Sequence, residues 1–176
     1  MITISVINDR NKADINLPNE AFALIGRMIP SYTNEIWEHT IEKYEETEIS
    51  EMCFPDENYD YDAMKENTFF VGAYENEKCI GLAILQKSWH KYIYLYDLKV
   101  CRDWRKCGVG SLLIEKAKEI AKENNYNGIY RVGQDNNLAA CQFYIKTGFQ
   151  IGGFDNHVYK GTNQEGKADI YFYFDC

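Results

Sequence analysis

The sequence is poor in the residues and runs that mark fibrous, disordered or membrane-spanning chains. Only 3 of its 176 residues are Pro and 12 are Gly, too few for a fibrous or disordered chain. No apolar run approaches the roughly 20 residues that a bilayer-spanning helix needs, which excludes an integral membrane protein. The segment from Met1 to Arg10 lacks the basic start and long apolar stretch of a secretory signal. A cytoplasmic protein is therefore expected.

The sequence also lacks metal-binding spacing. Its cysteines form no Cys-x-x-Cys pair, and its 3 histidines lie far apart in the chain, so no zinc motif is present and no metal is expected. Only a site assembled from distant residues stays open. The cysteines are expected to be mostly small buried thiols in a reducing compartment. They are Cys53, Cys79, Cys101, Cys107, Cys141 and Cys176.

What is present indicates a single globular domain over residues 1–176. About 45% of the residues are apolar, and the chain holds 14 Tyr, 9 Phe and 3 Trp. A chain of this length can bury a full core, and a high aromatic content favours a packed interior rich in strands. No repeat, linker or low-complexity segment divides the chain.

The negative charge is concentrated in one region. The net charge is −8, and the segment from Glu35 to Glu66 holds 12 acidic residues against Lys43 and Lys65, leaving 15 acids and 17 bases elsewhere. Such a field repels nucleic acid and anionic lipid and attracts cations. A solvated helix face followed by an acidic loop explains the charge equally well until other residues call for a cationic partner.

Hydrophobic periodicity predicts a mixed α+β fold. Helices are expected where apolar residues recur every three or four positions, and strands where they alternate or run together. The expected helices cover residues 17–30, 34–44, 111–124 and 137–146, with a short one near 61–66. The expected strands cover residues 2–7, 69–74, 79–86, 92–100, 128–132, 149–159 and 168–174.

The segment Arg105-Lys106-Cys107-Gly108-Val109-Gly110-Ser111 lies between an expected strand and an expected helix. Its glycines allow the backbone to approach a bulky ligand, and a helix N-terminus offers free N–H groups to an anion. A pyrophosphate is the natural ligand, although an isolated Gly-x-Gly is more often only a tight turn. The segment is neither a P-loop nor a complete dinucleotide fingerprint.

A second segment makes the pattern specific. The chain resembles the GNAT superfamily of acetyl-CoA-dependent N-acetyltransferases, since Arg105-x-x-Gly108-x-Gly110 matches its pyrophosphate loop and residues 137–149 match its next motif. The matching residues there are Asn137, Ala140, Phe143, Tyr144, Lys146, Gly148 and Phe149. Within the superfamily the chain looks like the streptothricin acetyltransferases. The residues that carry this resemblance are Trp89, Tyr92, residues 96–100, 134–138 and 149–152, and the early segment Phe22 to Pro30. The implied fold is a mostly antiparallel sheet, splayed at the CoA site, with helices on both faces.

The resemblance implies roles for individual residues. Backbone groups of Leu98, Lys99 and Val100 would bind the pantetheine arm and polarise the thioester. Amides of Lys106, Cys107, Gly108, Val109, Gly110 and Ser111 would hold the pyrophosphate, with Arg105 adding charge. Asn137 would bond the pantetheine amide, and Tyr144 would give a proton to the departing thiolate. The plainer alternatives are a helix N-cap for Asn137 and a core aromatic for Tyr144.

The acceptor side is less defined. Asp97 is the candidate general base, with Tyr94 or Tyr96 lining a water path, although a carboxylate paired with a nearby Lys explains Asp97 equally well. A polycationic acceptor such as streptothricin, with its β-lysine arm, would suit the acidic region. The candidate acceptor contacts are Glu38, Asp56, Asp60, Asp62 and Tyr96, with Glu42 and Glu45 in the same region.

The sequence leaves other acceptors and another class of function open. The acceptor could instead be a polyamine, an aminoglycoside or a protein amine, and a CoA-binding module without turnover is the alternative from another class. The resemblance also allows a homodimer through the last strands. Acetyl-CoA and a cationic amine are the expected partners.

Overall fold

The computed structural model describes all residues, 1–176, and divides them into two compact units. The first unit contains Met1–Ala21, Cys53–Ile129 and Cys176, and the second contains Phe22–Met52 and Tyr130–Asp175. The single domain expected from the sequence stays a prediction. No helix is long and apolar enough to cross a bilayer.

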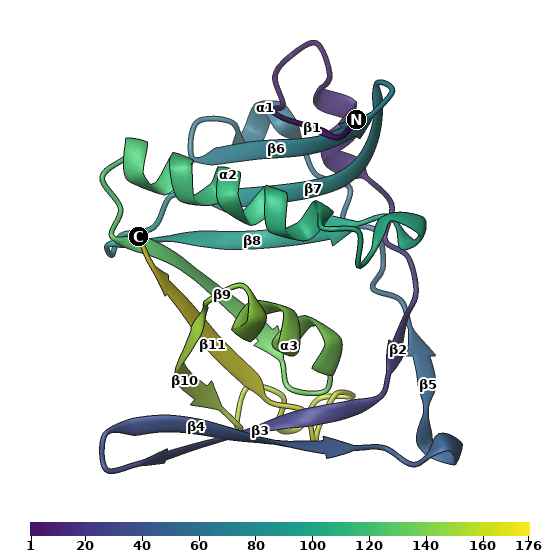
Figure 1. Cartoon of the computed structure of the whole chain (residues 1–176), viewed down its shortest axis with the longest axis vertical. Coiled ribbons are helices and arrows are strands. Elements are labelled where there is room, and N and C mark those ends of the chain that lie inside the picture. The colour runs from purple at the N-terminus through teal and green to yellow at the C-terminus, as the bar shows by residue number, and fades with distance from the viewer. The chain divides into compact units, whose positions relative to one another are not determined.

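The first unit is built on an antiparallel sheet in the order β1-β6-β7-β8. Its helix α2 lies along β6, β7 and β8 (Figure 1). The sequence predicted all four strands, including the edge strand near the N-terminus. The elements are β1 (Thr3–Val6), η1 (Lys12–Asn16), α1 (Tyr61–Met64), β6 (Thr68–Glu75), β7 (Lys78–Gln86), β8 (Tyr92–Val100), η3 (Arg102–Trp104) and α2 (Val109–Glu123).

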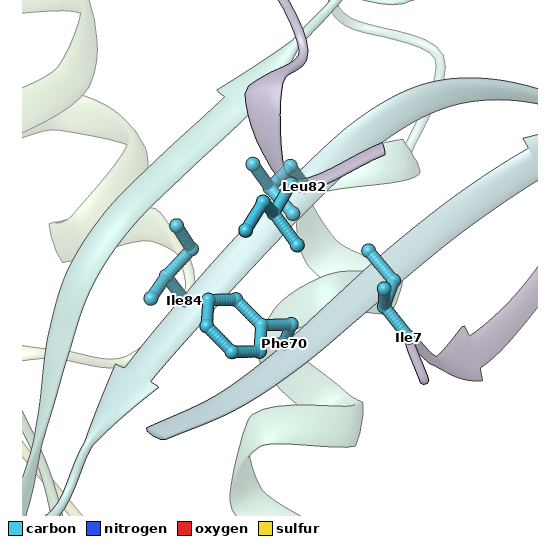
Figure 2. Packing of buried hydrophobic residues seen from close by; sticks show 5 residues of the cluster. Ile7, Phe70, Leu82 and Ile84 are labelled. Atoms are coloured by element: carbon cyan, nitrogen blue, oxygen red, sulfur yellow. The ribbon is translucent and has the colours of Figure 1, made fainter. Parts of the chain in front are cut away.

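The side chains of β7 alternate between the two faces of this sheet, and each face is covered by other elements of the first unit. Leu82 and Ile84 point to one face, where they pack in a buried cluster with Ile7, Ile15 and Phe70 (Figure 2). On the other face, a Cβ added to Gly81 would lie 3.0 Å from the side chain of Val109. The prediction of helices on both faces of a mostly antiparallel sheet is confirmed.

The second unit combines two small antiparallel ladders with a sheet in the order β9-β11-β10 and one helix. Strand β9 begins in the first unit and passes into the second at Tyr130. The elements are β2 (Phe22–Leu24), β3 (Gly26–Thr33), β4 (Ile36–Lys43), η2 (Glu46–Glu48), β5 (Ser50–Met52), β9 (Gly128–Gln134), α3 (Leu138–Lys146), β10 (Gln150–Asp155) and β11 (Asp169–Asp175).

The prediction of helices over residues 17–30 and 34–44 was wrong, because these residues form β2 and the β3–β4 hairpin. Asn34 and Glu35 have φ values of 53° and 64°, the backbone of a two-residue turn that reverses a strand. Ile36, which the expected helix over residues 34–44 would have buried, is 61% exposed. Pro30 is tolerated because this ladder has only two strands and both are edges.

The remaining elements agree with the sequence apart from their ends. Helix α2 begins at Val109, two residues before the expected start. Strand β10 ends at Asp155, earlier than predicted, and β11 is shifted by one residue toward the C-terminus. The acidic segment read as a loop also contains η2 and β5. The hairpin between β6 and β7 turns at Asn76 and Glu77, which again have positive φ.

Candidate active site

The loop from Arg105 to Ser111 has the geometry of an open backbone cradle. Lys106 and Gly108 have φ values of 64° and 85°, so the chain makes two left-handed steps before the helix begins. Gly108 is the N-cap of α2, and a Cβ built on it would meet nothing within 4 Å. The space beside Gly108 is therefore free for a ligand to approach the backbone.

The N-terminus of α2 is left available to an anion. Its N-cap provides no side-chain hydrogen bond, and its first turn contains no acidic residue. The first N–H groups of an α-helix have no partner within the helix, and the helix dipole adds partial positive charge there. The loop and helix start therefore have the geometry of an anion site, and their contact with the pyrophosphate of acetyl-CoA stays a prediction.

Arg105 has a structural role that the sequence did not predict. Its Nε donates to the carbonyl of Val100 at 3.1 Å, and its two terminal nitrogens donate to the carbonyls of Ala21 and Glu20 at 2.8 and 3.2 Å. The guanidinium thus joins the end of β8 to residues 20–21. Its contact with the pyrophosphate stays a prediction.

Strand β8 carries a β-bulge at the centre of the candidate site. Leu95 pairs with Leu85 and Asp97 pairs with Ile84, so Tyr96 is an extra residue in β8. A bulge of this kind turns two successive side chains to the same side of the sheet. Tyr96 and Asp97 therefore share the face on which Ile84 lies, and Tyr96 is 38% exposed there.

Asp97 belongs to a compact charged group on this face, which we call the Lys99 cluster: Glu57, Tyr59, Asp97 and Lys99. The Nζ of Lys99 lies 2.5 Å from a carboxylate oxygen of Glu57 and 3.3 Å from Oδ2 of Asp97. The Tyr59 hydroxyl donates to the same Oδ2 at 2.9 Å. Lys99 and Asp97 are largely buried, with side chains 8% and 13% exposed. The alternative of a lysine-paired Asp97 is therefore what the structure shows; its role as base stays a prediction.

The pKa values of Glu57 and Tyr59 in the Lys99 cluster are shifted by burial and by neighbouring charges. Burial opposes ionisation of Glu57, but the hydrogen bonds from Lys99 and Asn19 and the charge of Lys99 outweigh it, so the pKa of Glu57 is lowered. Burial, followed by the charge of Asp97, raises the pKa of Tyr59. Tyr59 therefore keeps its proton and acts as a donor at neutral pH.

Aromatic rings line the same face. The ring centroids of Tyr59 and Tyr96 are 5.9 Å apart, and those of Tyr94 and Tyr96 are 5.8 Å apart, both pairs in edge-on geometry. The ammonium of Lys99 lies 5.5 Å from the centre of the Tyr59 ring. The combination of ring faces with a carboxylate is one that binds ammonium groups.

Three predicted acceptor contacts have local partners in the first unit. Asp56 accepts from the backbone N–H of Asn19, Asp60 caps α1, and Asp62 forms ion pairs with Lys12 and Lys65. The two lysines lower the pKa of Asp62 to about 2. Of the three acids only Asp62 is paired with cations, and contact of the three with an acceptor stays a prediction.

In the second unit Glu38 lies exposed on β4, and Asn137 and Tyr144 lie at α3. Asn137 is the N-cap of this helix, and its Oδ1 accepts from the N–H of Ala140 at 3.3 Å. Tyr144 is 4% exposed, and its ring packs against Phe149 and Phe172. The structural alternatives for both residues are thus present; their roles toward acetyl-CoA stay predictions.

Sequence reasoning gave no role to the buried Asp135. Its Oδ1 accepts from the N–H of Ala168 at 3.0 Å, its Oδ2 lies 3.5 Å from a guanidinium nitrogen of Arg27, and its carbonyl accepts from the N–H of Met28. Asp135 therefore fixes the connection from β9 to α3 against β3. An aspartate two residues before a helix cap is the only signal that the sequence offered.

Sequence reasoning also missed Glu57, Tyr59 and the side chain of Lys99. The alternation of Asp97 and Lys99 along one strand could have suggested an ion pair. Nothing local to residues 53–60 indicates that Glu57 and Tyr59 lie against that strand, because the contacts span 42 and 38 positions in the chain.

Comparisons with known proteins agree with the geometry. Residues 33–149 match the family model described as the Acetyltransferase (GNAT) family. The chain is 35% identical to streptothricin acetyltransferase A of Bacillus subtilis (strain 168) over 164 residues, which cover 93% of this chain and 94% of that one. It is 32% identical to a streptothricin acetyltransferase of Escherichia coli over 114 residues, covering 64% and 66% of the two chains.

One similar solved structure contains the acetyl donor. It is a crystal structure of a Bacillus anthracis str. Ames protein, assigned as a streptothricin acetyltransferase, in complex with acetyl coenzyme A. The TM-score is 0.88 and the identity 32%, with 100% of both chains covered. The glycine loop is open, the N-terminus of α2 has no side-chain cap, and the family model covers residues 33–149. The chain therefore belongs to the GNAT family of acetyltransferases and uses acetyl-CoA.

Proposed function

We propose that this enzyme acetylates an amine of a polycationic small molecule, and that the acceptor is the β-lysine amino group of streptothricin. The observation that carries the proposal is the 35% identity to streptothricin acetyltransferase A across 94% of that protein. The reaction would confer resistance to the antibiotic. The cytoplasmic location expected from the sequence is part of this proposal, as is a homodimer.

The proposed chemistry is direct transfer. The acceptor ammonium loses one proton to a base, and its nitrogen forms a bond to the thioester carbonyl carbon. The nitrogen then gives up a second proton, the carbon–sulfur bond breaks, and the CoA thiolate takes up a proton. An alkyl ammonium has a pKa near 10.4, so a base must assist its deprotonation at neutral pH. We assign this role to Asp97, directly or through water. Backbone groups of β8 near Leu98, Lys99 and Val100 would polarise the carbonyl.

The first unit supplies the proposed pyrophosphate site. Backbone N–H groups from Lys106 to Ser111 would bind the two phosphates, because the loop approaches without side chains at Gly108 and leads into an uncapped helix. The positive charge of Lys106 would add to this attraction.

In the second unit we assign two roles on the family resemblance. Asn137 would bond the pantetheine arm while capping α3, since an amide side chain can donate through its NH₂ group while its oxygen accepts from Ala140. Tyr144 would protonate the departing thiolate. Its packing against Phe149 and Phe172 fixes the ring orientation.

Polyamines, aminoglycosides and protein amines remain the rival acceptors, and the charge distribution favours a small polycation over a neutral amine. Glu38 and Glu42 project from the same face of β4, because they are separated by four residues in a strand, and both are exposed. In the β3–β4 ladder Glu38 lies opposite Ser31 and Glu42 lies opposite Arg27, whereas Asp62 forms ion pairs with two lysines. We therefore place the steering field of the acceptor on these two glutamates.

Replacement of Gly108 tests the pyrophosphate loop. Gly108→Asp puts a negative side chain into the open space at a left-handed φ of 85°, so acetyl-CoA binding should fall by at least about a hundredfold. Binding is measured by titration calorimetry on the folded variant. Gly161→Asp is the matched control, because Gly161 also has positive φ and open space around it. Equal acetyl-CoA affinity in the two variants would remove the loop from the site.

Tyr144→Phe tests the proton donor. The variant keeps the packed ring and removes the hydroxyl, so kcat should fall by roughly 10²- to 10⁴-fold with acetyl-CoA affinity retained. Tyr126→Phe is the control, since it removes a hydroxyl bonded to the backbone of Ser88. An unchanged kcat in Tyr144→Phe, with chemistry rate-limiting, would leave Tyr144 as a core residue only.

The acceptor is tested by following thiol release with streptothricin, spermidine, an aminoglycoside and a lysine peptide. Streptothricin should give the highest kcat/KM. Its KM should rise steeply with ionic strength and in Glu38→Gln/Glu42→Gln, with kcat little changed, because screened attraction contributes to binding and not to chemistry. Glu115→Gln/Glu119→Gln on α2 removes the same charge as a control. A higher kcat/KM for another amine would contradict the streptothricin assignment.

A further inference from the structure

Lys99 is a cation buried on the sheet face that carries Asp97 and Tyr96. Its side chain is 8% exposed, and besides Glu57 and Asp97 it donates to the carbonyl of Leu17 at 3.3 Å. A buried ammonium is tolerated only where such partners offset its loss of hydration. Lys99 therefore requires Glu57, from a loop 42 positions away, to lie against β8.

That loop, residues 53–60, has no regular structure and depends on specific bonds for its position. Its backbone is tied to residues 16–19: Asn16 bonds both backbone groups of Tyr59, at 2.6 and 2.9 Å, and Asn19 bonds Pro55, Asp56 and Glu57. Two hydrogen bonds attach its side chains to β8, namely Lys99 to Glu57 and Tyr59 to Asp97. Lys99 thus holds Glu57, two residues before Tyr59, against β8.

The placement of Tyr59 leaves half of the Asp97 carboxylate open. The Tyr59 hydroxyl and the Lys99 ammonium both contact Oδ2, so Oδ1 has no partner in the structure. The rings of Tyr59 and Tyr96 lie beside this carboxylate. The Lys99 cluster contains two carboxylates and one ammonium, so its formal charges leave one excess negative charge, which matches a single ammonium.

We propose that Tyr59 is a specificity-determining residue that forms, with Tyr96 and Oδ1 of Asp97, a subsite for an ammonium group of the acceptor. Glu57 and Lys99 are the positioning residues that hold Tyr59 in this subsite. The ligand class is a primary alkyl ammonium, bound by charge, by one hydrogen bond to Oδ1 and by cation–π contact with the tyrosine rings. This inference rests on the proposed function, because it assumes a cationic acceptor.

Replacing Lys99 separates positioning from simple charge. Lys99→Met changes the net charge of the Lys99 cluster from −1 to −2. If only the field mattered, the acceptor would bind more tightly. If Lys99 positions the subsite, the acceptor binds more weakly, because Glu57 and Asp97 then repel each other and the loop moves Tyr59 away. The two explanations predict opposite signs.

The experiment measures KM for the acceptor, KM for acetyl-CoA, kcat and Tm in Tyr59→Phe, Lys99→Met, the double variant, and Lys116→Met as a control. Lys116 forms an exposed ion pair with Glu119 on α2. The amine used is the one on which the unmodified enzyme has its highest kcat/KM. Acceptor KM should rise about fivefold in Tyr59→Phe and about tenfold or more in Lys99→Met, with acetyl-CoA KM within about twofold.

The double variant supplies a further readout. Because Lys99 acts through Tyr59, adding Tyr59→Phe to Lys99→Met should raise acceptor KM little further, whereas independent roles would multiply. Lys116→Met should leave acceptor KM within about twofold. If Lys99→Met does not fold, Tyr59→Phe alone decides, since it removes one hydroxyl and keeps the ring.

Two results would overturn the inference: an acceptor KM that is unchanged or lower in folded Lys99→Met, or an unchanged acceptor KM in Tyr59→Phe. Failure of the proposed function looks different, because it is read from the ranking of acceptors by the unmodified enzyme. The inference is read from the ratio of variant to unmodified enzyme on one amine, whichever amine that is.

Discussion

The buried ammonium of Lys99 is the constraint on which the first unit's candidate site depends. A charge removed from water must find anions or carbonyls, and Lys99 finds Glu57, Asp97 and the carbonyl of Leu17. Those partners come from three separate parts of the chain. Satisfying one charge thus brings an irregular acidic loop against the central strand and sets Tyr59 beside Asp97.

Two backbone irregularities shape the candidate site of the first unit. The bulge at Tyr96 turns two successive side chains of β8 to one face, so an aromatic ring and a carboxylate stand together where regular alternation would separate them. Left-handed backbone at Lys106 and Gly108 presents N–H groups at the start of α2. The side chains and the backbone groups that we assign to ligand binding therefore belong to one strand–loop–helix segment, on β8 and at the start of α2.

The sequence predicted the elements from residue 68 onward because their signals are local. Apolar alternation defines β6–β8, Asn137 and Gly148 bracket α3, and the glycine loop precedes α2. The hairpin of β3 and β4 was missed because Ile36, Trp37 and Ile41 also fit a helical spacing, and the deciding feature is the positive φ of Asn34 and Glu35. The Lys99 cluster was missed because its partners meet only in the folded chain.

The central claim, that Lys99 holds the loop of residues 53–60 in place, is tested most directly by amide hydrogen exchange. The N–H of Tyr59 bonds Oδ1 of Asn16, so its protection reports on the loop without any assay of turnover. In Lys99→Met the amides of residues 53–60 should exchange at least about tenfold faster than in the unmodified protein, with those of β6 and β7 unchanged. Lys116→Met should show no such effect. Equal protection of the loop in Lys99→Met and the unmodified protein would contradict the account.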